Sequence, residues 1–207
     1  MRPGAIVVLT ITFLLLSGCL SQQGRSPTNY YVLEFDAAVA GRSTDLPAPD
    51  EAAGRRQAVV IQEAEVAPMY DRRQLLQRLE GPLVRYRSAD LWAVSPPTAV
   101  ADLVREAVEW SGLFGVVRQG RNAEGRYQIV SRVDELAHYC CEEPLSARVA
   151  GEFALIDLTS REVLVRHEFE RREDLPGVRP RAFVEAVARV LSEETVAFLS
   201  DSADAVE

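Results

Sequence analysis

The chain begins with an apolar run that is too short to span a bilayer. Arg2 precedes the stretch from Ala5 to Leu16, which reads AIVVLTITFLLL. A basic start and about a dozen apolar residues are typical of a secretory signal sequence, whereas a membrane-spanning helix needs roughly 20 residues. We therefore expect residues 1–18 to be removed as a signal peptide and to take no part in the fold.

The segment that ends this run is Leu16-Ser17-Gly18-Cys19. It resembles the lipobox of bacterial lipoproteins, in which the chain is cut before the cysteine and the sulfur receives a diacylglyceryl group. The resemblance implies cleavage between Gly18 and Cys19 and lipidation of Cys19. One acyl chain binds a bilayer only marginally, because each buried methylene contributes about 0.8 kcal/mol, but two or three chains hold a protein firmly. The alternatives are a plain secretory signal and a buried helix with a chance cysteine.

Residues 19–29 form the lipidated N-terminus and a polar tether. Leu20 follows Cys19, at the position where an aspartate favours inner-membrane retention in enterobacterial lipoproteins. This favours an outer-membrane anchor with the domain facing the periplasm, and the inner membrane is the alternative. The tether spans at most about 35 Å. The folded part must therefore stay near its leaflet, and any work between membranes needs a partner that reaches it.

The rest of the chain has the size and composition of one domain. We expect this single periplasmic domain over residues 30–200 and an acidic tail over 201–207. The sequence has 23 Lys plus Arg against 31 Asp plus Glu, for a formal net charge of −8. Because nucleic-acid binding depends on neutralising phosphates, we do not expect this acidic chain to bind nucleic acid.

Two amphipathic helices separate groups of strand-like segments. The first is expected after Ser95, an N-cap residue followed by Pro96 and Pro97, and is expected to end at Gly112. The second covers 181–200. The strand-like segments, rich in aromatic and β-branched residues, are 30–35, 58–66, 75–79, 83–87, 127–139, 146–158 and 162–170. This order predicts an α+β fold: a mixed or antiparallel β-sheet with both helices packed on one face, in two layers.

Two segments carry more specific expectations. Residues 37–57 are rich in Gly, Pro and charge, which predicts a loop. In the long strand 127–139, a two-residue alternation places a set of apolar side chains on one face. That set is Tyr127, Ile129, Val133, Ala137 and Tyr139.

The sequence lacks the common signatures of catalysis. It has no G-x-x-x-x-G-K-[ST], G-x-G-x-x-G or G-x-S-x-G motif. Of its two histidines, His167 lies on an apolar strand face, where packing is the expected role. We expect no enzyme activity, no catalytic residue, no metal and no cofactor.

Cys140 and Cys141 are adjacent near the end of a predicted strand, so their side chains are expected to point to opposite faces. A free pair, a locally oxidised pair and an intermolecular disulfide all remain open in an oxidising compartment. A metal site that adds His138, Glu142 and Glu143 has no supporting ligand spacing.

Two short motifs flank the predicted hairpin. Pro68-Met69-Tyr70-Asp71-Arg72-Arg73-Gln74 follows a strand, and Asp90-Leu91-Trp92 comes just before the first helix. Together with the lipobox, the early Tyr30-Tyr31-Val32-Leu33 strand and the C-terminal helix, this order resembles the ABC-type transport auxiliary lipoprotein family. The paraquat-inducible protein C lipoproteins belong to that family. The similarity covers roughly residues 30–199.

The resemblance implies an auxiliary subunit, not a pump. It would act beside an MCE-domain protein that bridges the two membranes for lipid transport, while an ABC transporter or another inner-membrane partner supplies energy or substrate. A homo-oligomeric ring around that partner rests on analogy. The alternative function is a structural or assembly lipoprotein of another envelope machine, such as a secretion channel or outer-membrane assembly complex.

The resemblance also singles out six residues, which are Tyr70, Asp71, Arg72, Arg73, Gln74 and Trp92. They match the family pattern, and two interpretations of their role are open, one structural and one functional. In the structural one, Arg72 and Gln74 close a turn and Trp92 packs under the helix start. In the functional one, they contact the partner.

Overall fold

The computed structural model of the chain describes residues 27–40, 57–120, 122–141 and 143–206. The predicted signal peptide, Gly18, Cys19 and most of the tether lie outside these residues. So does most of the predicted loop at 37–57. Its first residues form a short helix, α2 (Ala37–Ala40), where a loop was expected.

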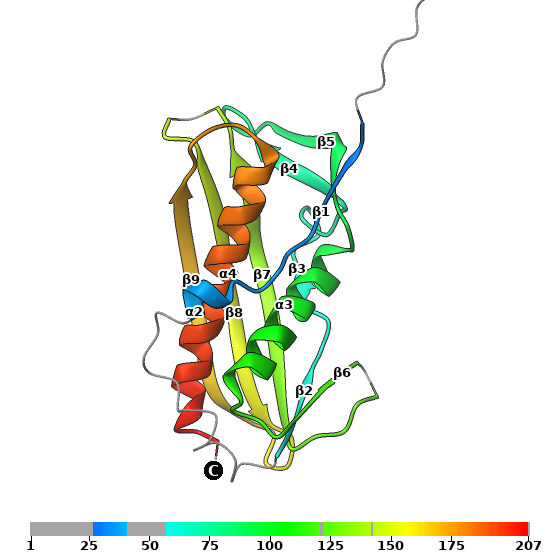
Figure 1. The fold of residues 1–207 in the computed structure, drawn as a ribbon, viewed down its shortest axis with the longest axis vertical. Coiled ribbons are helices and arrows are strands. Elements are labelled where there is room, and N and C mark those ends of the chain that lie inside the picture. Colours follow the sequence, from blue (N-terminus) through cyan, green and yellow to red (C-terminus); the bar gives the residue numbers. More distant parts are fainter. Residues whose placement is uncertain (1–26, 41–56, 121, 142, 207) are drawn as a thin grey trace, which may run out of the picture.

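The described residues form one nine-stranded mixed sheet with two long helices on the same face (Figure 1). This confirms the predicted α+β fold. The helices are α3 (Pro96–Ser111) and α4 (Pro180–Ala203). The strands are β1 (Asn29–Tyr31), β2 (Ala58–Ile61), β3 (Glu65–Val66), β4 (Gln74–Arg78), β5 (Val84–Trp92), β6 (Val116–Gln119), β7 (Tyr127–Tyr139), β8 (Ser146–Asp157) and β9 (Glu162–Asp174). None of the helices in these ranges is long and apolar enough to cross a bilayer.

Strand β7 is the centre of the sheet. It pairs antiparallel with β8 along nearly its whole length, and β8 pairs in turn with β9. Its other edge is shared by β2, β3 and β4, which all run parallel to it. Strand β5 pairs with β4, and β1 pairs parallel with β5. Segments from most of the chain therefore meet on one strand.

Both long helices bury one face against the sheet. Helix α3 follows Ser95 and ends at Gly112, whose φ of 63° is the left-handed conformation that glycine adopts freely. Helix α4 packs against β8 and β9. There the ring of Phe153 on β8 lies 5.7 Å from Phe198 on α4 and 5.2 Å from Phe169 on β9. All three rings are buried.

A β-bulge changes the face assignment of β7. The register shifts between Val133 and Glu135, so one extra residue enters β7. Tyr139 therefore lies on the face away from the helices, where it stacks with Arg148, and not on the face of Tyr127 as predicted. Ala137 moves with it. The prediction from strict alternation fails because the extra residue moves every later side chain of β7 to the opposite face of the sheet.

The bulge lies where two backbones approach closely. Val133 is in register with Gly151 on β8. A Cβ added at Gly151 would lie 2.1 Å from the carbonyl oxygen of Arg132 and 3.2 Å from the ring of Phe169. Only glycine fits this position without moving the backbone.

Two other differences concern short strands. The segment 58–66 forms β2 and β3 with a break between them, because β2 pairs with the start of β7 and β3 with its middle. Strand β6 was not predicted. It is four residues long and mostly exposed, so it lacks the apolar pattern that marks the other strands.

One end of the sheet carries the start of the described chain. Arg78, Tyr139, Ser146 and Asp174 lie in register across β4, β7, β8 and β9. The β4–β5, β7–β8 and β9–α4 connections leave from this row. Because β1 runs parallel to β5, Pro27 and Thr28, the first described residues, lie on the side of Asn29 that faces the same end (Figure 1). We call it the tether end.

Candidate partner-binding surface

The structure divides the family motif into buried and exposed parts. Tyr70 and Trp92 are 4% and 2% exposed. The residues between them in the first motif, Asp71, Arg72, Arg73 and Gln74, are all exposed. The buried members belong to the core, so the exposed members are the ones available to a partner.

The buried members fix the motif to the rest of the fold. The hydroxyl of Tyr70 accepts a hydrogen bond from Nη2 of Arg78 at 3.3 Å. Burial raises the pKa of Tyr70, although this bond opposes the shift. The ring of Trp92 lies 6.3 Å from the ring of Phe183 in the first turn of α4. The two side chains therefore hold the motif to β4 and to α4.

A tight turn makes the exposed members project. The backbone N–H groups of Tyr70 and Asp71 both donate to the carbonyl of Ala67, at 2.8 and 3.1 Å. The side chain of Arg73 then bridges to the end of β5. Its Nε donates to the carbonyl of Trp92 at 3.1 Å, and its Nη2 donates to that of Ala93 at 2.7 Å. Backbone bonds and Arg73 thus set the shape of this turn.

Two arginine side chains stack on exposed tyrosine rings beside the turn. The guanidinium of Arg72 lies 5.2 Å from the ring centroid of Tyr86, and that of Arg73 lies 5.7 Å from Tyr30. Tyr30 is 60% exposed and Tyr86 is 36% exposed. We call these four residues the arginine–tyrosine surface. Arg and Tyr are the residue types enriched in protein interfaces and among their most important contacts.

Asp90, from the second motif, anchors the start of the domain. Its carboxylate accepts hydrogen bonds from Nδ2 of Asn29 at 2.9 Å, the hydroxyl of Tyr31 at 3.1 Å and Nε of Arg87 at 2.6 Å. Burial alone would raise the pKa of this carboxyl. The three hydrogen bonds outweigh burial, so the pKa of Asp90 lies below its ordinary value. This cluster ties β1 to β5.

A cleft of about 630 Å³ lies beside the motif and is open to solvent. It brings together the β2–β3 connection, the turn and the start of α3, and three of its residues are acidic. Its lining is Gln62, Glu63, Ala64, Glu65, Val66, Asp71, Ser95 and Pro97. A polar, acidic lining is unsuited to an anionic lipid or an acyl chain.

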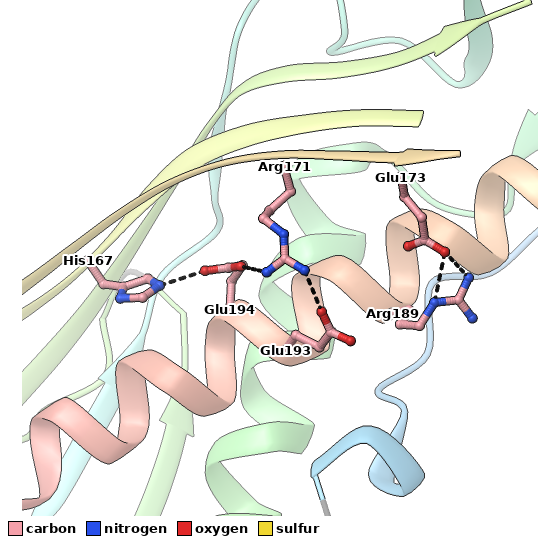
Figure 2. Close-up of polar contacts among 6 residues, drawn as sticks. All are labelled: His167, Arg171, Glu173, Arg189, Glu193 and Glu194. Atoms are coloured by element: carbon pink, nitrogen blue, oxygen red, sulfur yellow. Dashed lines mark hydrogen bonds and ion pairs between the residues drawn. The ribbon is translucent and has the colours of Figure 1, made fainter. Parts of the chain in front are cut away.

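A line of ion pairs joins β9 to α4 (Figure 2). Nε2 of His167 lies 2.8 Å from a carboxylate oxygen of Glu194, whose other oxygen pairs with Arg171. Arg171 also donates to Glu193 at 2.9 Å, and Arg189 pairs with Glu173. Glu194 is only 7% exposed, so its two partners hold the edge strand to the helix.

The other histidine and the cysteines lie near the tether end of β7. His138 is 1% exposed, stacks on Phe183 at 5.3 Å, and has its pKa lowered to about 4, chiefly by burial. The sulfurs of Cys140 and Cys141 are 3.5 Å apart, so the prediction that they point to opposite faces is wrong. The reason is that β7 ends at Tyr139. Among the described residues, no group of three or more His, Cys, Asp or Glu could hold a metal ion.

Sequence reasoning missed the Asp90 cluster and the ion pairs of β9. Asn29 and Asp90 are 61 positions apart, and Arg171 and Glu194 are 23 apart. No local pattern marks such pairs. The only signal was Asp90 itself, which stands in the Asp90-Leu91-Trp92 motif but was not selected as a site residue.

Two solved structures share the fold. A protein from Xanthomonas campestris described under the DUF330 family model has a TM-score of 0.68 and 15% identity, covering 86% of this chain and 96% of that one. An uncharacterized protein has a TM-score of 0.63 and 10% identity, covering 83% of this chain and 96% of that one. The PelC dodecamer from Paraburkholderia phytofirmans has a TM-score of 0.45 and 16% identity, covering 71% and 87% of the two chains.

The sequence comparisons place the chain in a family. The search of curated proteins finds no match. A family model described as "ABC-type transport auxiliary lipoprotein component" matches residues 42–197, which include every strand from β2 onward, α3 and most of α4. The chain therefore belongs to the family of ABC-type transport auxiliary lipoprotein components.

Proposed function

We propose that this chain is a non-enzymatic auxiliary lipoprotein of an MCE-type intermembrane lipid transport system. Its arginine–tyrosine surface, with the neighbouring Asp71 and Gln74, docks the periplasm-spanning MCE-domain partner. Lipid on Cys19 holds the domain at the inner leaflet of the outer membrane. Energy for transport comes from other subunits.

The observation that carries this proposal is the exposure of four consecutive motif residues, Asp71 to Gln74, in a chain of the transport auxiliary family. Tyr70 and Trp92 are buried in the core, so these four exposed residues are the part of the motif that a partner can reach. The stacked Arg72 and Arg73 are also pre-oriented by Tyr86 and Tyr30, which lowers the entropy lost when a partner binds them.

The short tether would keep a lipidated domain close to its leaflet. Residues 20–26 separate Cys19 from the first described residue, Pro27, and span at most about 25 Å. The domain is therefore held next to its leaflet. A partner that spans the periplasm would bring its far end to this domain.

Site-specific photocrosslinking in cells tests the docking surface. A photoreactive residue at position 71 or 74 is expected to capture an MCE-domain protein. The same residue at Glu168, exposed on β9 away from the motif, is the matched control and is expected to capture far less. Capture of a secretion channel or an outer-membrane assembly factor would instead favour the alternative envelope machine. Equal capture at all three positions would refute the surface.

Charge reversal at Arg72 measures its contribution. This side chain touches Tyr86 but lies outside the core, so Arg72→Glu is expected to leave the fold intact. If Arg72 is a central contact, binding to the partner should weaken by about 10-fold or more.

A separate measurement tests the anchor. Mass spectrometry of the mature N-terminus should show an acylated Cys19, and membrane fractionation should place the protein with the outer membrane.

A further inference from the structure

A cavity of about 410 Å³ opens at the tether end of the molecule. It lies between the start of β1, strand β5 and the first turn of α4, and three arginines line it, one from β5 and two from the start of α4. We call it the arginine pocket. Its lining is Pro27, Asn29, Tyr31, Arg87, Ala89, Asp90, Arg179, Pro180 and Arg181.

The arginine pocket is locally basic in an acidic protein. Asp90 is its only acidic lining residue, and its carboxylate is already engaged by three donors. Arg181 pairs with Glu185, but these side chains are 81% and 56% exposed, so the pair is weak and can open. Arg179 is exposed as well. Against a formal net charge of −8 for the whole chain, this concentration of arginine favours an anionic ligand.

Two exposed apolar side chains lie on connections at the same end of the sheet as the arginine pocket. Leu83 on the β4–β5 connection is 58% exposed, and Val178 on the β9–α4 connection is 55% exposed. Both connections leave the sheet at the tether end (Figure 1). Arginine next to exposed aliphatic side chains is the combination found where proteins rest on lipid headgroups. Glu80 and Glu143 lie on neighbouring connections, so the attraction for anions is confined to the arginine pocket.

The short tether would keep the arginine pocket close to the lipid headgroups. Pro27 lines the pocket and is also the residue at which the tether enters the domain. If Cys19 is lipidated, as proposed above, the headgroup layer lies within about 25 Å of this point. An anchored protein would thus meet lipid phosphates at a high effective concentration.

We propose that the arginine pocket binds the phosphate of an anionic phospholipid in the leaflet that holds the anchor, with Arg179 and Arg181 as the main contacts. Binding orients the domain so that its tether end lies on the leaflet and the β8–β9 turn points away from it. The lipid anchor supplies attachment, and the pocket supplies orientation.

Hydrogen–deuterium exchange of the lipidated protein in vesicles tests this inference. Vesicles contain phosphatidylcholine alone or phosphatidylcholine with phosphatidylglycerol. Amides at the start of α4 are expected to be protected only in the second kind, and high salt should remove the protection. Each arginine near an anionic surface changes the docked-to-undocked ratio by about 5-fold, so Arg179→Gln with Arg181→Gln should lower it by about 30-fold.

Three controls separate the outcomes. Arg161→Gln, in the β8–β9 turn at the opposite end, should behave like the unaltered protein. Flotation with both kinds of vesicle tests the anchor independently, and its failure would refute lipidation. Flotation with equal protection in both vesicles would refute the pocket alone. Inorganic phosphate added to phosphatidylcholine vesicles is expected to give no protection. Full protection there would assign the pocket to free anions and overturn the lipid assignment.

Discussion

Replacing Asp90 by alanine tests how the start of the domain is held. The substitution removes the acceptor of three hydrogen bonds, one of them from the charged Arg87. Neutral bonds contribute about 1 kcal/mol each and a charged one about 1.5–3 kcal/mol. The donors lie near the surface, and the Arg87 side chain is 32% exposed, so water molecules partly replace the hydrogen bonds lost with the Asp90 carboxylate. We expect Asp90→Ala to lower the free energy of unfolding by about 2–3 kcal/mol.

The loss should appear where β1 meets β5. The amide of Ala93 donates to the carbonyl of Tyr31 at 2.7 Å, so its hydrogen exchange reports the opening of β1. A loss of about 2–3 kcal/mol corresponds to a fall in its protection of about 30- to 150-fold. Urea unfolding gives the matching global value.

A double-mutant cycle supplies the control. Asn29→Ala should cost about 1 kcal/mol in the natural chain and almost nothing when Asp90 is already alanine, because its partner is gone. The pH dependence has a definite sign. Because the pKa of Asp90 is lowered by folding, its stabilisation is present above pH about 4 and is lost as the pH falls through the folded pKa. Equal costs of Asn29→Ala in both backgrounds would refute the reasoning.

Three further changes test other parts of the fold. Gly151→Ala places a Cβ against the carbonyl of Arg132 and should destabilise the protein by about 3 kcal/mol in urea unfolding, whereas a neutral result would contradict the close approach at the bulge. His138 is neutral when buried, because burial lowers its pKa to about 4, so stability should be full well above pH 6.5 and fall by about 2–3 kcal/mol as the pH is lowered toward 4.5. His138→Gln should abolish that fall, and an unchanged fall would place its origin elsewhere. Arg73→Lys cannot bridge two carbonyls with one planar group and should cost about 1–2 kcal/mol by thermal or urea unfolding; no cost would mean that this bridge is unimportant.

The two long helices were predictable because their signals are local, whereas the short α2 was not predicted. Ser95 with the two following prolines marks the start of α3, and Gly112 marks its end, as the structure confirms. Every strand except β6 was predictable as part of a segment, but the faces and partners of the strands were not. The bulge in β7 depends on Gly151 in another strand, so no pattern within residues 127–139 predicts it.

The candidate surface could be found only in part from the sequence. The motif of Tyr70 to Gln74 marked the correct turn, but sequence gave no way to separate buried from exposed members. That separation depends on Arg78 and Phe183, which pack against the two buried ends. Tyr30 and Tyr86 complete the surface from two other strands, and their contribution requires the register of β1 and β5.

The central position of β7 has a consequence for the order of folding. Strands β2, β3 and β4 precede β7 in the chain, yet each pairs with it in parallel. A chain delivered N-terminus first cannot complete these pairings until residues 127–139 emerge, and α4, which covers β8 and β9, arrives last. Such long-range pairing is slow to form. The sheet around β7 therefore cannot be completed until the second half of the chain is available, so the pairing of the N-terminal strands depends on residues made long after them.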